Sequence, residues 1–335
     1  MAKNQLDPDL RGYLETNKDI LTVIEKPVSI DDIGALSAQS DGPILFENII
    51  EHPGFRLCDM LVRHRWSQCR ALGVEEKDYL PTLAQRLRKP PRGFVDVDTG
   101  PVKEVIWTDK EADWLKLPIP IHSELEDKPY VTAMNIVKDP ETGFYNSSHA
   151  GTQAVGPHKG LVSFITPHTH AIIQKYLARG EKEMPIAVVF GIPPAFEIMG
   201  NFSGLHMDLW GEMEMVGTIM DMDIEMVPCE TIPLTVPAHA EIIVEAVVDL
   251  TSQTDVGVGV SPSMYYLPKT ATLPDMRIQA ITMRKDRPIY RNHLTTPDTD
   301  HQTLPRLCHE AVLYNRLTEI GVKIHDIQFP TWGAA

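Results

Sequence analysis

Three polar residues in the second half of the chain have side chains that suit a hard divalent cation. Asn146 follows Phe-Tyr in a predicted turn, His170 begins a predicted helix after a proline, and Glu212 begins another predicted helix. An amide oxygen, an imidazole nitrogen and a carboxylate oxygen suit Mn²⁺ or Mg²⁺, above all an ion shared with a phosphate. The N-terminus of a helix also favours phosphate. The spacing alone leaves a second interpretation open: a turn asparagine, a core histidine and a capping glutamate.

Other sequence patterns with known chemistry are weak or missing. His168 and His170 would share one face of a strand, but the same spacing makes a poor ligand pair on a helix. The chain contains no HExxH, no GxGxxG, no GxxxxGK[ST] and no GxSxG. A zinc hydrolase, a Rossmann or P-loop nucleotide site and a nucleophile-elbow hydrolase are therefore unsupported. The Gly-Val alternation at 257–260 is more typical of a strand than of a phosphate loop.

Composition narrows the classes of protein further. The chain has 335 residues with 43% hydrophobic and 23% charged residues, which is typical of a globular protein of about two domains. Its net charge of −15 argues against nucleic acid or an anionic membrane as the main partner. The four cysteines are far apart, as in reduced intracellular proteins. No signal peptide or membrane span is evident, so we expect a cytoplasmic protein.

The elements that must position these residues change in character near residue 103. Before it, predicted strands within 21–28 and 42–49 alternate with helical patterns, the longest of which covers 55–73. This β-α-β-α order favours a small α/β domain. After it, segments rich in β-branched residues are separated by Pro, Gly and Asp turns, and helices are predicted over 168–181 and 211–221. An all-β core with few inserted helices is typical of a barrel or a sandwich.

The last part of the chain returns to a helical pattern. Residues 303–321 predict an amphipathic helix that ends at Gly321, and 322–330 read as a strand. We therefore predict an α+β protein with three parts. They are an N-terminal α/β domain over 1–102, a β-rich domain over 103–300, and a helix and strand over 301–335 that return to the N-terminal domain.

Several segments, in order along nearly the whole chain, resemble the UbiD family of prenylated-FMN-dependent decarboxylases. The two most specific are YVTAMNIVKDPETGFYN, which ends at Asn146, and VPCETIPLTVPAHAEIIVEA. The supporting segments are GPILFENI, KLPIPIHSE, MPIAVVFGIPPA, RIQAITMRKDRPIY and VKIHDIQFP.

The resemblance implies a fold, a cofactor and a reaction. The central domain would be a split β-barrel that binds the flavin. A divalent ion, Mn²⁺ or Mg²⁺, often accompanied by K⁺, would tie the flavin phosphate to Asn146, His170 and Glu212, with His168 replacing His170 if the local register differs by two. Ser148 and the loop at Asn201 and Ser203 would lie beside the flavin. The prenylated flavin would act as a dipole that takes up an aromatic or α,β-unsaturated acid and lets CO₂ leave, while the protein supplies position and proton transfer.

The chain departs from the family at the positions expected to carry catalysis. The arginine that usually follows the metal asparagine by five residues is Gly151 here. Of two usual carboxylates in the stretch TDVGVGVSPSMYY, Asp255 matches the first, whereas the second falls on Val260 or Ser261. His149 is a candidate replacement proton carrier; the alternative is a histidine on a strand face.

The chain also ends where family members usually continue into a C-terminal domain used in assembly and in closing the active site. We therefore expect a homo-oligomer, or a hetero-oligomer with a chain that supplies this region. Three functions stay open: a decarboxylase or carboxylase, an enzyme of different flavin chemistry, and a non-catalytic subunit of a decarboxylase complex.

Overall fold

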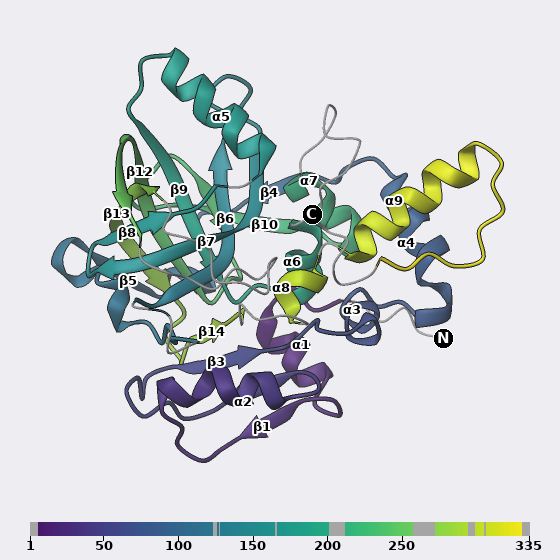
Figure 1. Ribbon diagram of the computed structural model, residues 1–335, viewed down its shortest axis with the longest axis horizontal. Coiled ribbons are helices and arrows are strands. Elements are labelled where there is room, and N and C mark those ends of the chain that lie inside the picture. The colour runs from purple at the N-terminus through teal and green to yellow at the C-terminus, as the bar shows by residue number, and fades with distance from the viewer. Residues whose placement is uncertain are drawn as a thin grey trace.

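The centre of the protein is a closed β-barrel, seen in a computed structural model that describes residues 6–122, 126, 128–164, 166–200, 212–256, 272–293, 299–304 and 306–329 (Figure 1). Six strands follow one another in the order β12-β9-β6-β7-β8-β13, and pairing of β12 with β13 closes the ring. Every neighbouring pair is antiparallel. The six strands are β6 (Tyr130–Lys138), β7 (Tyr145–Gly156), β8 (Lys159–Val162), β9 (Glu183–Phe190), β12 (Ile242–Asp255) and β13 (Thr272–Met283). The prediction of an α+β protein with a barrel is thus confirmed.

Alternate residues of β6 belong to two different hydrophobic cores. Val131, Ala133 and Val137 pack with inward residues of the other barrel strands. Met134 and Ile136 pack into a second core, between the barrel and the helices. This alternation is what a barrel strand covered by helices requires, since successive side chains point to opposite faces.

Two short helices cover the outer face of β7 and carry residues discussed below. They are α6 (Pro194–Gly200) and α7 (Glu212–Met220), which contact each other and β7. Helix α5 (Pro167–Ala178) follows β8 and contacts β9 at one end of the barrel (Figure 1). Helix α9 (Arg306–Glu319) packs against α4 (Tyr79–Leu87) from the N-terminal region. The other helices are α1 (Leu10–Thr16), α2 (Ile33–Gln39), α3 (Arg65–Ala71) and α8 (Asp300–Thr303).

The N-terminal sheet contains a strand from late in the chain. Its order is β1-β2-β3-β14, and β14 pairs with β3 in parallel. A smaller sheet, β11-β10-β4, and strand β5, which adds to β13, complete the fold. These strands are β1 (Thr22–Ile24), β2 (Ile44–Phe46), β3 (Arg56–Asp59), β4 (Phe94–Asp96), β5 (Val105–Thr108), β10 (Ile224–Pro228), β11 (Thr235–Pro237) and β14 (Ile289–Arg291).

Two predicted elements differ in the structure. The helix expected over 55–73 is the strand β3 followed by the helix α3, because β3 pairs on both sides with β2 and β14. The strand expected over 322–330 forms no ladder in its described residues. Instead Arg65 holds Asp326 at 2.8 Å, and the Phe329 backbone N–H donates to Glu310 at 2.8 Å. Side chains, not strand pairing, thus hold this segment.

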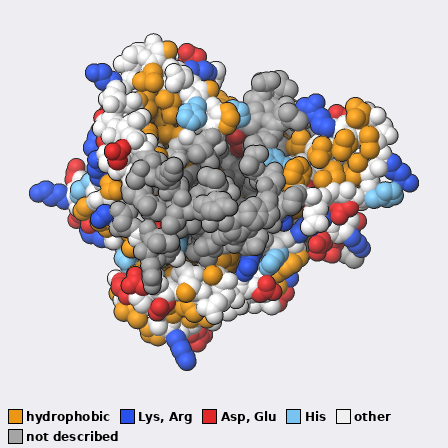
Figure 2. All heavy atoms as spheres, viewed as in Figure 1, with side chains coloured by type: hydrophobic (Ala, Val, Ile, Leu, Met, Phe, Trp, Pro, Cys, Tyr) orange, Lys and Arg blue, Asp and Glu red, His pale blue; other side chains and the backbone are white. Residues whose placement is uncertain are grey.

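The surface mixes charges of both signs with some exposed hydrophobic side chains. On the face shown in Figure 2, hydrophobic groups gather over α9 and the chain that follows it. Leu313, Ile320 and Val322 of this part of the chain are exposed. Within the described ranges, every helix is too short or too polar to cross a membrane.

The turn that leads from β9 into α6 depends on a glycine, which predicts a measurable contrast. Gly191 has φ +73°, and an added Cβ would lie 2.5 Å from the Glu241 side chain, which Arg11 holds at 2.8 Å. Gly180 has φ +78° but open space around it. We expect Gly180→Ala to lower the free energy of unfolding by about 1–2 kcal/mol through backbone strain. We expect Gly191→Ala to cost a further ~1–3 kcal/mol through overpacking. Equal urea unfolding curves for the two variants would contradict this account.

Candidate functional site

Asn146, Glu212 and a histidine of α5 come together where two helices begin beside β7. Glu212 is the first residue of α7, and its Oε1 lies 3.5 Å from Nδ1 of His168. Asn146 is buried on β7 and donates from Nδ2 to the Thr169 hydroxyl at 3.2 Å, next to His168 in the chain. His168 and Glu212 thus face each other directly, and Asn146 reaches the same turn of α5 through Thr169. We refer to Asn146, His168 and Glu212 as the first cluster.

The Glu212 carboxylate lacks a full set of partners. The side chain is 4% exposed, and Oε2 has no hydrogen-bond partner in the part of the chain that the structure describes. Burial raises the pKa of Glu212, and the nearby His168 side chain and Ser147 backbone oppose this rise. A buried carboxylate that lacks partners is costly, so this site favours a bound cation.

His170, which we expected to complete this set, is exposed on α5. Two residues along a helix rotate a side chain by about 200°, so His168 and His170 point in nearly opposite directions. The structure therefore brings His168, the alternative that the sequence left open, to Glu212.

Helix starts add a second feature to the first cluster. Pro167 is the first residue of α5, a position where its missing N–H is no loss. The first turns of α5 and α7 contain His168 and Glu212. Backbone N–H groups at two helix N-termini, next to Asn146, His168 and Glu212, form a suitable environment for a phosphate.

The other residues expected beside the flavin are only partly described. Ser148 is buried on β7 and pairs across the ladder with Asn135. Asn201 and Ser203 lie outside the described residues, as do Val260 and Ser261. Asp255 lies exposed at the end of β12, where it accepts a hydrogen bond from Thr272 at 2.7 Å.

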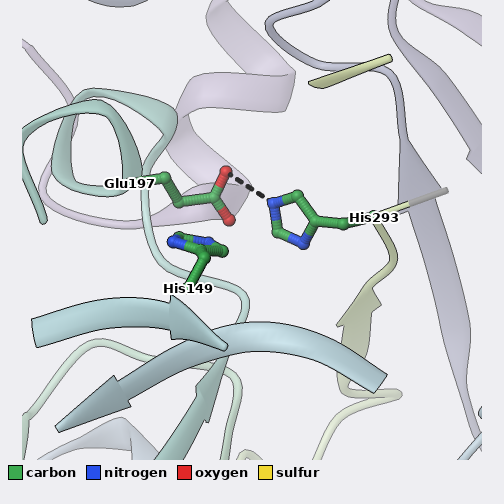
Figure 3. Close-up of side chains that lie close together, drawn as sticks. All are labelled: His149, Glu197 and His293. Atoms are coloured by element: carbon green, nitrogen blue, oxygen red, sulfur yellow. Dashed lines mark ion pairs between the residues drawn. The ribbon is translucent and has the colours of Figure 1, made fainter. Parts of the chain in front are cut away.

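His149 belongs to a second cluster of buried polar residues on the outer face of β7. His149, Glu197 of α6 and His293, just after β14, point toward one another (Figure 3). Their ligand-type atoms all lie within 4.8 Å of one another, and each side chain is at most 6% exposed. We refer to these three residues as the second cluster.

A buried arginine adjoins the second cluster. Arg291 Nε donates to Glu197 Oε2 at 3.2 Å, its Nη2 donates to Asp300, and its Nη1 lies 3.5 Å from Asp59. Burial raises the pKa of Asp59 to about 6, although Arg291 opposes the rise. It also raises the pKa of Asp300. One guanidinium thus faces three carboxylates.

Sequence reasoning missed Glu197, Arg291 and His293. Glu197 is a single acidic residue in an apolar segment to which we assigned no element. Arg291 lies in a segment that we predicted to be β-rich, and His293 follows directly after that segment. No sequence motif marks these three residues, and only the folded structure shows that they are buried together.

The space beside Gly151 is filled by an aromatic side chain. An added Cβ at Gly151 would lie 1.6 Å from the Tyr130 hydroxyl oxygen. Tyr130 is the first residue of β6, paired with Gln153, and burial raises its pKa to about 12. An arginine at position 151 is therefore incompatible with Tyr130 as it is placed.

This contact predicts strong coupling between the two positions. Gly151→Ala should lower the free energy of unfolding by about 1–3 kcal/mol, because the new Cβ forces Tyr130 to move. In a Tyr130→Ala background the same change should cost close to zero. A double-mutant cycle by urea denaturation measures the coupling, and additive effects would contradict it.

The chain is similar to known proteins in both family and fold. Residues 94–297 match the model of the UbiD family, described as the 3-octaprenyl-4-hydroxybenzoate carboxy-lyase Rift-related domain. An anhydromevalonate phosphate decarboxylase of Methanosarcina mazei is 29% identical over 315 residues, which cover 93% of this chain and 70% of the relative.

Two solved structures of a bacterial enzyme superpose on nearly the whole chain. They are the UbiD-class enzyme HmfF from Pelotomaculum thermopropionicum, as an evolved dimeric form with prFMN and as a complex with FMN. The first has a TM-score of 0.87 at 27% identity and covers 97% of this chain and 76% of its own. The second has a TM-score of 0.86 at 27% identity, with 96% and 72% covered.

Proposed function

This chain belongs to the UbiD family of carboxy-lyases, and we propose that it decarboxylates a non-aromatic α,β-unsaturated carboxylic acid with prenylated FMN as cofactor. The observation that carries the proposal is the buried Glu212 carboxylate, with one oxygen unpartnered among the described residues and the other facing His168.

We assign the binding of the cofactor phosphate to the first cluster. Asn146, His168 and Glu212 offer an amide, an imidazole and a carboxylate, which suit Mn²⁺ or Mg²⁺, and K⁺ is a further candidate at the same phosphate. His168 thus takes the role that we first expected of His170. Ser148 is proposed to lie beside the flavin because it is two residues from Asn146 on the same face of β7. Asn201 and Ser203 keep the flavin-side role that the resemblance implies.

The chemistry divides between cofactor and protein. Prenylated FMN would supply an electron sink for the pair left by the breaking C–C bond. The chain must hold the acid in place, exclude water and deliver a proton to the carbon that loses CO₂. We propose that the proton reaches the site through the second cluster. Asp255, exposed and bonded to Thr272, is the weaker candidate for this role.

The names of the relatives support the proposed substrate class. The Methanosarcina protein is described by an unsaturated aliphatic acid phosphate, whereas the family description names an aromatic acid. The first match spans 93% of this chain, so we favour the aliphatic class.

Co-expression with a flavin prenyltransferase tests this proposal. We expect anaerobically purified protein, prepared with Mn²⁺ and K⁺, to retain one prenylated flavin per chain, identified by absorbance and by the mass of the released ligand. It should release CO₂ from anhydromevalonate phosphate and not from 4-hydroxybenzoate. Failure to retain flavin would overturn the cofactor assignment, and turnover of the aromatic acid alone would overturn the substrate class.

A second candidate function is a flavin-binding subunit without decarboxylase activity of its own, or with other flavin chemistry. The packing of Tyr130 against Gly151 favours it, because no arginine can occupy that position to orient a substrate carboxylate. Flavin retention without CO₂ release from either acid, alone or with a partner chain, would support this alternative. Light scattering of the purified chain would test the oligomer that we expect.

A further inference from the structure

We infer that His149, Glu197 and His293 bind a divalent transition metal, and that zinc is the ion the three side chains favour. Two imidazoles and one carboxylate are the protein ligands of many zinc sites that keep one position open. This donor set differs from that of the first cluster, where oxygen donors favour Mn²⁺ or Mg²⁺. His149 is three residues beyond Asn146, about 10 Å along the strand and on its opposite face. The second cluster is therefore a separate site.

The orientation of His293 is the main evidence. Its Nδ1 lies 3.1 Å from the Thr132 carbonyl oxygen, so Nδ1 carries the proton and donates it there. The lone pair then belongs to Nε2, which lies 3.5 Å from Glu197 Oε2. Nε2 is buried and has no hydrogen-bond partner among the described residues. A backbone carbonyl that holds one ring nitrogen while the other faces a carboxylate is the usual arrangement of a metal-binding histidine.

The geometry needs only a small contraction to hold an ion. Ligand atoms around a tetrahedral zinc ion with bonds of 2.0–2.1 Å are roughly 3.4 Å apart. The His293–Glu197 separation of 3.5 Å already meets this value. The largest separation within the set is at most 4.8 Å, so one ligand must approach by about 1.4 Å or less.

The local charge also favours a divalent cation. Among the described residues, Asp59, Glu197 and Asp300 all face Arg291, so three carboxylates share one guanidinium. All four side chains are at most 2% exposed, so solvent does little to compensate this excess of carboxylates. A divalent ion on Glu197 would reduce it.

A metal bound at the second cluster would also change which group delivers the proton to the substrate carbon. His149 and His293 cannot carry a proton on a nitrogen that coordinates the ion. A water in the open position would supply the proton instead, since zinc lowers the pKa of bound water to near 7. This last step rests on the proposed function, whereas metal binding does not.

The experiment uses flavin-free, chelator-treated full-length protein and Zn²⁺ alone, so the result does not depend on the cofactor. We expect titration calorimetry and metal analysis to show one tightly bound equivalent that His149→Asn and His293→Asn weaken by at least about 100-fold. His325→Asn, at an exposed position, should leave binding unchanged. Glu212→Gln should keep this equivalent, which separates the second cluster from the first.

Unchanged zinc affinity in His293→Asn would overturn the inference. Melting temperatures check that the variants fold. Should they fail to fold, Co²⁺ added to the unmodified protein decides: visible ligand-field bands with nitrogen ligands support the site, and their absence contradicts it.

Discussion

Glu212→Gln should abolish flavin retention while leaving the protein folded. The glutamine keeps the shape of the side chain but removes the negative charge that the proposed metal requires. Removing one partner of a buried charge pair costs about 2–5 kcal/mol, which corresponds to a loss of at least roughly 30-fold in affinity. The flavin-to-protein absorbance ratio after co-expression with the prenyltransferase measures the loss, and CO₂ release should fall with it.

The melting temperature of the cofactor-free variant gives a second test of the same assignment. Burial raises the pKa of Glu212, so the ionised carboxylate is unfavourable without a cation. The apo variant should therefore melt at the same temperature as the unmodified apo protein, or higher. Glu183→Gln, at an exposed position paired with Arg277, serves as the matched control and should retain flavin fully. Stoichiometric flavin in Glu212→Gln would refute the assignment of the first cluster.

Arg291→Met should cause a large loss of stability. The substitution keeps an apolar stem but leaves Asp59, Glu197 and Asp300 buried without their shared cation. Breaking a buried ion pair from one side costs about 3–5 kcal/mol. Arg277→Met removes an exposed partner of Glu183 and should change the free energy of unfolding by less than about 0.5 kcal/mol. Urea denaturation of both variants measures the contrast.

The loss in Arg291→Met should depend on pH in a defined direction. The pKa of Asp59 is about 6 in the folded protein, above the ordinary value near 4, so the folded state binds a proton more tightly than the unfolded state. Arg291 lowers this pKa, so in Arg291→Met the carboxylate takes up its proton at a still higher pH, and acidification reduces the repulsion that the missing guanidinium leaves. The destabilisation should therefore be smaller at pH 5 than at pH 8. An equal loss at both values would show that the carboxylates do not carry the effect.

Sequence periodicity predicted the parts of the fold that depend on local pattern. The helices over 168–181, 211–221 and 303–321 correspond to α5, α7 and α9. In α5 and α9, buried apolar residues recur at helical spacing among exposed polar ones, whereas α7 is buried on nearly all sides. The helix over 55–73 was a wrong prediction for Arg56–Asp59. That segment has both patterns, and a partner strand more than 200 residues away decides between them.

The candidate site likewise contains residues that the sequence predicted and residues that only tertiary packing brings together. Asn146 and Glu212 stand at element boundaries that the sequence marks, so their neighbourhood was predictable with the help of the family resemblance. The histidine depended on the rotation of α5 about its axis, which a two-residue difference reverses. Glu197 and His293 lie in segments without a chemical motif, and only the packing of α6 and β14 brings them to His149.

The pairing of β14 with β3 has a consequence for how the protein folds during synthesis. Arg56 must wait for Ile289, 233 residues later, before the N-terminal sheet gains its fourth strand. At typical translation rates of about 5–20 residues per second, this delay is roughly 10–50 s. Throughout that interval one edge of β3 has no partner and is open to wrong pairing. The N-terminal half is thus most exposed to wrong pairing during synthesis, when a chaperone would protect it most. Arg291 is part of β14, the strand that ends this exposure.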